Sequence, residues 1–159
     1  MVREDGTRRR AGVGAAVALT AIGLIHAGWA MGSPWPARDV ETLVEHILGP
    51  FARDSSPLPP APTWGIAALL WAASLTLLGR LGLWGGWLPR WPFRWASWTL
   101  GGVLTTRALA GFGISAFSAR VRGSTFGRWN ALLYSPLCLV LALASLAVAS
   151  GDEETPRRP

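Results

Sequence analysis

Several residue types that carry chemistry are scarce or absent in this 159-residue chain. It contains no lysine and one cysteine, and no aspartate or glutamate lies between Ser55 and Gly151. A lone Cys138 can form neither an intrachain disulfide nor a cysteine metal cluster, which excludes dithiol redox chemistry. Carboxylate-driven chemistry inside a membrane needs an acidic group there, and none is available unless Glu41 or Glu45 enters from a loop.

Sequence motifs of common catalytic sites are also missing. There is no phosphate-binding loop, dinucleotide-binding motif, zinc-protease motif or nucleophile elbow. The only histidines are His26, near the end of an apolar segment, and His46, in a polar loop, so a haem with two histidine ligands is not expected. The arginines lie mostly between apolar segments, which is typical of topology signals rather than of a nucleic-acid interface. The sequence predicts no metal, no cofactor and no nucleic-acid partner.

What the chain has in excess is apolar length. Half of its residues are hydrophobic and its mean hydropathy is positive. The excess lies in four segments, at about residues 11–31, 63–83, 95–117 and 131–149. Each is close to the ~20 residues that a helix needs to cross a ~30 Å hydrocarbon core. The sequence therefore predicts a single-domain, all-α integral membrane protein with four transmembrane helices and flexible tails at 1–9 and 151–159.

The distribution of arginine predicts that both termini are cytoplasmic, because cytoplasmic loops are enriched in basic residues. The first tail, the second loop and the last tail are basic, whereas segment 32–62 is acidic on balance and is expected outside. Three arginines in the third loop, Arg120, Arg122 and Arg128, oppose this orientation. An alternative is that residues 1–30 form a cleaved secretory signal, which would leave three spans. The length of the apolar run favours an uncleaved helix.

The first external loop is expected to contain a short amphipathic helix at residues 37–48. Its apolar positions follow the i, i+3, i+4, i+7, i+8 pattern, and they are Val40, Leu43, Val44, Ile47 and Leu48. The segment is too short to span a membrane, so we expect it to lie on the outer surface or to cap the bundle.

Arg107 lies near the middle of the third apolar segment. A charged side chain at this depth is costly in lipid and is by default a functional-site hypothesis. At ~1.5 Å per residue it lies about 18 Å from the inner surface, counted from Trp95. The same counting places His26, Trp71 and Ser135 in one outer layer, where Gly23 and Gly111 would leave room for a cavity.

A proline in the fourth segment disturbs the helix close to this layer. Pro136 cannot bond the carbonyl of Leu132, so a kink is expected there. Three interpretations of Arg107 remain open: an ion pair with Glu41 or Glu45, hydrogen bonds to free carbonyls and to Ser135, or an anionic ligand such as a lipid phosphate or carboxylate.

Two stretches resemble a known family when taken together: HAGWAMG, closing the first span at His26, and FGRWNALLYSPLCL, which leads into the fourth from Phe126. They are similar to small four-span bacterial membrane proteins catalogued as a domain of unknown function. The resemblance implies four spans, an uncleaved first helix and a bacterial plasma (inner) membrane, and no activity. In the four-span topology, Trp29 ends the first span and Arg128 and Asn130 begin the fourth, so we expect these residues to meet at one end of the bundle.

The leading hypothesis is an outward-facing pocket that binds an anionic lipid or small amphiphile. Its residues would be His26, Trp29, Trp71, Arg107, Arg128, Asn130 and Ser135. One alternative is an accessory or assembly protein whose polar residues serve helix packing and partner contacts. Another is an enzyme acting on a lipid-like substrate, with His26 as its acid or base. The sequence decides neither these alternatives nor the oligomeric state.

Overall fold

The helices account for most of the chain in the computed structural model, which describes residues 2–51 and 58–151. In chain order they are α1 (Val2–Ala30), α2 (Val40–Leu48), the 3-10 turn η1 (Gly49–Phe51), α3 (Pro60–Arg80), α4 (Trp91–Phe117), α5 (Thr125–Trp129), the π-helical turn η2 (Asn130–Tyr134) and α6 (Ser135–Ser150). The predicted all-α fold, with four long helices and one short one, is confirmed.

Four helical segments in the described part of the chain are long and apolar enough to cross a membrane. They are Gly6–Ala30, Pro60–Arg80, Trp91–Phe117 and Thr125–Ser150, the last of which runs through α5, η2 and α6. The chain is therefore a multi-pass membrane protein.

Helix α1 begins at Val2, so residues 2–9 are helical rather than a flexible tail. This is consistent with their composition, since the segment contains no proline, and arginine and glutamate are good helix formers. The predicted C-terminal tail lies outside the described residues except for Gly151.

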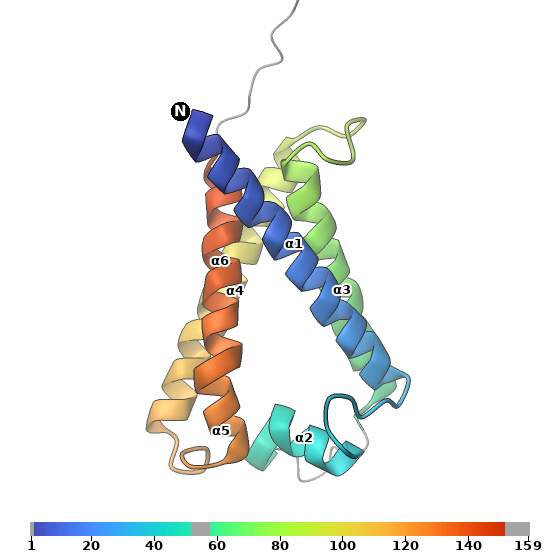
Figure 1. The fold of residues 1–159 in the computed structure, drawn as a ribbon, viewed down its shortest axis with the longest axis vertical. Helices are drawn as coiled ribbons and strands as arrows, with labels where there is room; N and C mark the ends of the chain where they lie inside the picture. The colour runs from blue at the N-terminus through green and yellow to red at the C-terminus, as the bar shows by residue number, and fades with distance from the viewer. Residues whose placement is uncertain (1, 52–57, 152–159) are drawn as a thin grey trace, which may run out of the picture.

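The long helices form two pairs, α1 with α3 and α4 with α6 (Figure 1). The pairs meet through a core of small and branched apolar side chains that includes Leu19, Leu77, Leu141 and Val148. Beyond this core the two pairs diverge, and α2 lies across the open end (Figure 1). The fold therefore holds its four spans together at one end and separates them at the other.

Helix α2 packs against α5, and its Val40 and Leu43 also line a pocket with residues at the end of α1 and the start of α3. Asp39 caps its N-terminus, where Oδ1 accepts the Thr42 amide at 2.8 Å, and this hydrogen bond lowers the pKa of Asp39. Leu43 and Val44 are buried, and the helix packs on α5. The helix was predicted to begin at residue 37. The Asp39 cap explains why it begins at Val40.

The fourth span contains the irregularity expected from Pro136. The backbone N–H of Ser135 donates to the carbonyl of Asn130, five residues earlier, so η2 is a π-turn. Proline has no N–H to continue the ordinary ladder, and a wider turn just before it accommodates the missing bond. The turn lies between α5 and α6 and determines which way the side chain of Asn130 points.

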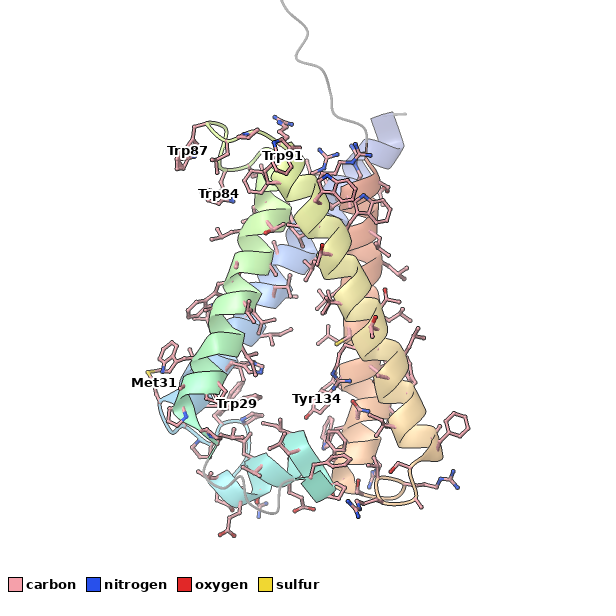
Figure 2. All side chains as sticks on the ribbon, turned by 180° about the vertical axis from the view of Figure 1, so that it is seen from behind. Trp29, Met31, Trp84, Trp87, Trp91 and Tyr134 are labelled. Carbon is pink, nitrogen blue, oxygen red and sulfur yellow. The ribbon has the colours of Figure 1, made fainter. Side chains whose placement is uncertain are left out.

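Tryptophan side chains mark the end of the molecule opposite α2. Trp84, Trp87 and Trp91 lie at the loop between α3 and α4, far from Trp29 and Met31 (Figure 2). Trp87 and Trp91 are exposed. Indole rings prefer the headgroup level of a bilayer, so these side chains are well placed to anchor this end at a membrane surface.

Candidate functional site

Asn130 organises a polar cluster between α4 and η2. Its amide nitrogen donates to the Gly111 carbonyl at 2.7 Å and to the Ser115 hydroxyl at 2.9 Å, and its Oδ1 accepts from Arg107 Nη2 at 3.1 Å. Only 1% of Asn130 is exposed, and its amide uses both donors and its oxygen. Asn130 therefore holds the guanidinium of Arg107 and has no donor left for a ligand.

Gly111 allows the helices to approach closely at this cluster. A Cβ at Gly111 would lie 2.6 Å from Arg107 Nη1 and even closer to Ser135 Oγ. The room expected beside Gly111 is therefore filled by these two polar side chains and is no cavity. Ser135 is fully buried, and its hydroxyl has no hydrogen-bond partner among the described residues.

Arg107 points along the inward face of α4. Leu100 and Leu104 pack against the central core, and Arg107 follows them at the i+7 and i+3 positions of the same face. The core ends before Arg107, whose side chain is exposed although it lies well inside a candidate span. Arg107 therefore lies beyond the end of the packed core, on the part of α4 that has diverged from the α1–α3 pair (Figure 1).

Tyr134 continues the inward face of the fourth span in the same way. It precedes Leu137 and Leu141, which belong to the core or pack on it, and its side chain points between the two helix pairs (Figure 2). Its hydroxyl donates to the His46 carbonyl of α2 in a long bond of 3.5 Å. Tyr134 thus links η2, which carries Asn130, to α2.

The other predicted site residues lie on the α1–α3 pair, and their polar groups are used locally. His26 Nδ1 bonds the Ile22 carbonyl at 2.9 Å, and its ring lies 4.6 Å from that of Trp29. Trp71 Nε1 donates to the Thr20 carbonyl at 3.3 Å. The Trp71 ring occupies the room expected beside Gly23. Because a carbonyl only accepts hydrogen bonds, Nδ1 of His26 must carry the hydrogen in this bond. Its other ring nitrogen, Nε2, is not used by it.

The structure thus divides the predicted set into two groups. Arg107, Asn130 and Ser135 form one cluster, whereas His26, Trp29 and Trp71 belong to the opposite helix pair. Within residues 2–51 and 58–151, no hydrogen bond or ion pair joins the two groups.

An ion pair of Arg107 with a loop carboxylate, one of the three interpretations left open by the sequence, is not observed in the described parts of the chain. Glu41 and Glu45 are both exposed on α2, because Leu43 and Val44 take the buried face of that helix. The hydrogen bond of Arg107 goes to Asn130 instead. Arg128 is exposed on α5 and does not join the cluster. Among the described residues, no hydrogen bond or ion pair joins His26 to a carboxylate.

Ser115 and Tyr134 were not predicted as site residues. A spacing rule could have found both, because Ser115 lies eight residues after Arg107 and Tyr134 four residues after Asn130, each on the same helix face. The apolar context of both residues made this signal weak.

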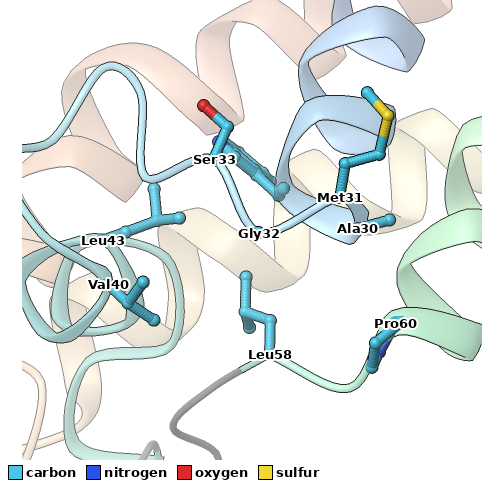
Figure 3. Close-up of a pocket in the computed structure, with 9 residues that line it drawn as sticks. Ala30, Met31, Gly32, Ser33, Val40, Leu43, Leu58 and Pro60 are labelled. Carbon is cyan, nitrogen blue, oxygen red and sulfur yellow. The ribbon is translucent and has the colours of Figure 1, made fainter.

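A separate apolar pocket of about 300 Å³ lies where α1 ends, near the starts of α2 and α3 (Figure 3). Its lining includes Met31, Val40, Leu43, Leu58 and Pro60. Trp29 is its only member from the predicted site. Of the described residues that line this pocket none is charged, and the Ser33 hydroxyl is among its few polar groups.

The unpartnered hydroxyl of Ser135 leads to a prediction about stability. Ser135→Ala is expected to raise the melting temperature of the detergent-solubilised protein, because a buried unsatisfied hydroxyl costs about 1–3 kcal/mol. Thermal unfolding followed by tryptophan fluorescence measures the change. Ser150→Ala is the control, because that exposed hydroxyl already bonds the Ala147 carbonyl. A lower melting temperature for Ser135→Ala would show that the hydroxyl has a stabilising partner.

Comparison with known families agrees with the architecture. A family model described as "Protein of unknown function (DUF3995)" matches residues 19–145. This is most of the chain, so the protein belongs to the DUF3995 family, and the resemblance seen in the sequence is confirmed. No curated protein and no solved structure matches the chain. The family description assigns no activity.

Proposed function

We propose that this protein binds an anionic amphiphile in the space between the two helix pairs, with the guanidinium of Arg107 as the anion-binding group. The observation that carries the proposal is that Arg107 has no negatively charged partner among the described residues. It lies within a candidate span, its side chain is exposed, and its hydrogen-bond partner is a neutral amide. Arginine at the centre of a membrane helix costs about 2.5–3.5 kcal/mol on insertion scales, so an uncompensated one is expected to serve a ligand.

The bonding of Arg107 supports this role. A guanidinium has five N–H donors, and Asn130 Oδ1 accepts from one of its nitrogens at 3.1 Å. That bond orients the planar guanidinium and does not use its other N–H groups. A fixed, partly free guanidinium is the usual form of a bidentate site for carboxylate or phosphate.

The proposal is tested on protein purified from its own membrane by native mass spectrometry with identification of bound lipids and metabolites. Wild-type protein is expected to carry an anionic ligand, and Arg107→Gln to retain about tenfold less, since a charge-assisted hydrogen bond contributes about 1.5–3 kcal/mol. Arg120→Gln is the matched control, because Arg120 is exposed in the loop between α4 and α5. Arg107→Lys should retain an intermediate amount.

Two results would count against anion binding. One is wild-type protein that carries no anionic ligand. The other is Arg107→Gln protein that melts like wild type and carries as much ligand. Either result would favour the accessory or assembly role, in which the cluster serves helix packing.

We also propose that α2 faces the outside of the cell and that both termini are cytoplasmic, as the arginine distribution indicates. In a Cys138→Ala background, Glu45→Cys on exposed α2 should react with a membrane-impermeant maleimide on intact cells. Leu88→Cys, in the exposed loop between α3 and α4, should react only after permeabilisation. The reverse labelling pattern would show that α2 faces the cytoplasm and that the proposed orientation is wrong.

A further inference from the structure

We infer that the anion held by Arg107 is the carboxylate of a single-chain amphiphile, a long-chain carboxylic acid, rather than a phosphate group. This inference rests on the proposed function and narrows its ligand class. Three properties of the site lead to it: its charge, its hydrogen-bonding groups and its depth.

The charge of the site matches a monoanion. Among the described residues, Arg107 is the one cation of the cluster, since Arg128 is exposed on α5 and bonds none of its members. A carboxylate and one guanidinium form a neutral pair. A phosphate monoester near neutral pH would bring a second negative charge, and an uncompensated charge is costly away from water.

The free hydrogen-bonding groups suit a small acceptor. Asn130 has both amide hydrogens and its oxygen engaged, and the Ser135 hydroxyl is fully buried. The donors that remain are the other N–H groups of Arg107 and the O–H of Ser115, whose oxygen accepts from Asn130. The guanidinium fork matches the two oxygens of a carboxylate. Among the described residues, the cluster has no carboxylate to bind an amine of a headgroup. It therefore favours a ligand whose polar part is small and accepts hydrogen bonds only.

Depth separates the two lipid sources of an anion. Arg107 lies ten residues before the end of α4 at Phe117, which corresponds to about 15 Å along the helix. The phosphate of a phospholipid lies outside the hydrocarbon core and stays ionised, so reaching Arg107 would draw its backbone and headgroup deep into the membrane. A carboxylic acid has a pKa near that of Glu, ~4.3, and can cross in its neutral form.

The surroundings also fit an alkyl chain. Leu104 and Leu137 are partly buried, apolar and adjacent to the cluster along α4 and α6. They can contact methylene groups but offer no polar partner to a larger headgroup. The ligand would thus place its charge on Arg107 and its chain along apolar side chains.

The test uses the full-length protein in nanodiscs of zwitterionic lipid. Binding of radiolabelled palmitic acid is measured, with palmitic acid methyl ester, hexadecyl phosphate and phosphatidylglycerol as competitors. We expect palmitic acid to bind and each competitor to displace it at least about tenfold more weakly than unlabelled palmitic acid does. The methyl ester loses a charge-assisted bond, hexadecyl phosphate brings an uncompensated charge, and the phosphate of phosphatidylglycerol lies outside the hydrocarbon core. Arg107→Gln should weaken binding by about the same factor, and Arg120→Gln should leave it unchanged.

Each other result overturns one or both proposals. If hexadecyl phosphate or phosphatidylglycerol competes as well as palmitic acid, the carboxylate inference fails and anion binding stands. If none of the anionic probes binds, or if the methyl ester competes equally and Arg107→Gln binds normally, both fail. Melting temperatures of the variants, taken in the same nanodiscs, show whether lost binding reflects lost folding. If Arg107→Gln does not fold, Arg107→Lys replaces it; this variant keeps the charge but loses the guanidinium fork, so binding with wild-type affinity overturns the carboxylate inference, and no binding by either folded wild type or this variant overturns both.

Discussion

Asn130→Leu is expected to lower the melting temperature of the protein by about 10 °C, the effect of losing roughly 2–4 kcal/mol of hydrogen bonding. Asn130 is almost fully buried and bonds Arg107, Gly111 and Ser115 at once. Leucine has a similar size but leaves the guanidinium without its partner. Thermal unfolding in detergent and ligand content by native mass spectrometry give the two readouts, and both should fall.

Asn130→Asp separates the packing role of this residue from its role in holding a free cation. A carboxylate in the same place can accept from Arg107 and neutralise it. The variant should therefore be more stable than Asn130→Leu but lose the anionic ligand to the same extent as Arg107→Gln. An Asn130→Leu protein that melts with wild type, or an Asn130→Asp protein that keeps its ligand, would contradict the structure of the cluster.

Gly111→Ala is the second substitution with a large expected effect, a loss of about 1–3 kcal/mol, which is typical of overpacking. The new methyl group would overlap Ser135 Oγ and lie 2.6 Å from Arg107 Nη1. The serine is buried at the contact of α4 with α6, so relief requires the two helices to shift. Thermal unfolding should show the loss.

A second substitution should rescue this variant. Ser135→Ala removes the atom that the new methyl group overlaps most, so the double variant should be more stable than the sum of its single effects by about 1 kcal/mol, within the range seen for contacting residues. Gly113→Ala is the matched control on the same helix, because its methyl group would meet nothing within 4 Å beyond its own helix turn. It should be neutral or slightly stabilising, because alanine favours helix over glycine. Additive effects in the double variant would place Ser135 away from Gly111.

The spans could be predicted from the sequence because their signal is local. Each needs only about 20 apolar residues, and the prolines near the starts of α3 and α4 occupy first-turn positions where a missing N–H costs little. The short helix after the first span was equally readable from its apolar pattern, but the Asp39 cap that sets its start was not predicted. Pro136 predicted an irregular turn for the same reason, and η2 lies directly before it.

The neighbours of the polar residues could not be predicted in this way. Counting along the helices placed His26, Trp71, Arg107 and Ser135 at one depth, but depth does not say which helix lies beside which. The pairing of α1 with α3 and of α4 with α6 puts His26 and Arg107 on different pairs. The predicted pocket, made of all these residues together, stays a prediction.

The sequence by itself determined that this chain crosses a membrane four times, carries a short helix after the first span and places one arginine at depth. These properties follow from length, hydrophobicity and the absence of acidic residues in the later spans, all of which are readable one segment at a time. Only the tertiary structure decided that Arg107 bonds Asn130 and not Glu41 or Glu45. The reason is physical: the π-turn before Pro136 and the close approach at Gly111 bring η2 against α4, while the burial of Leu43 and Val44 turns the carboxylates of α2 away.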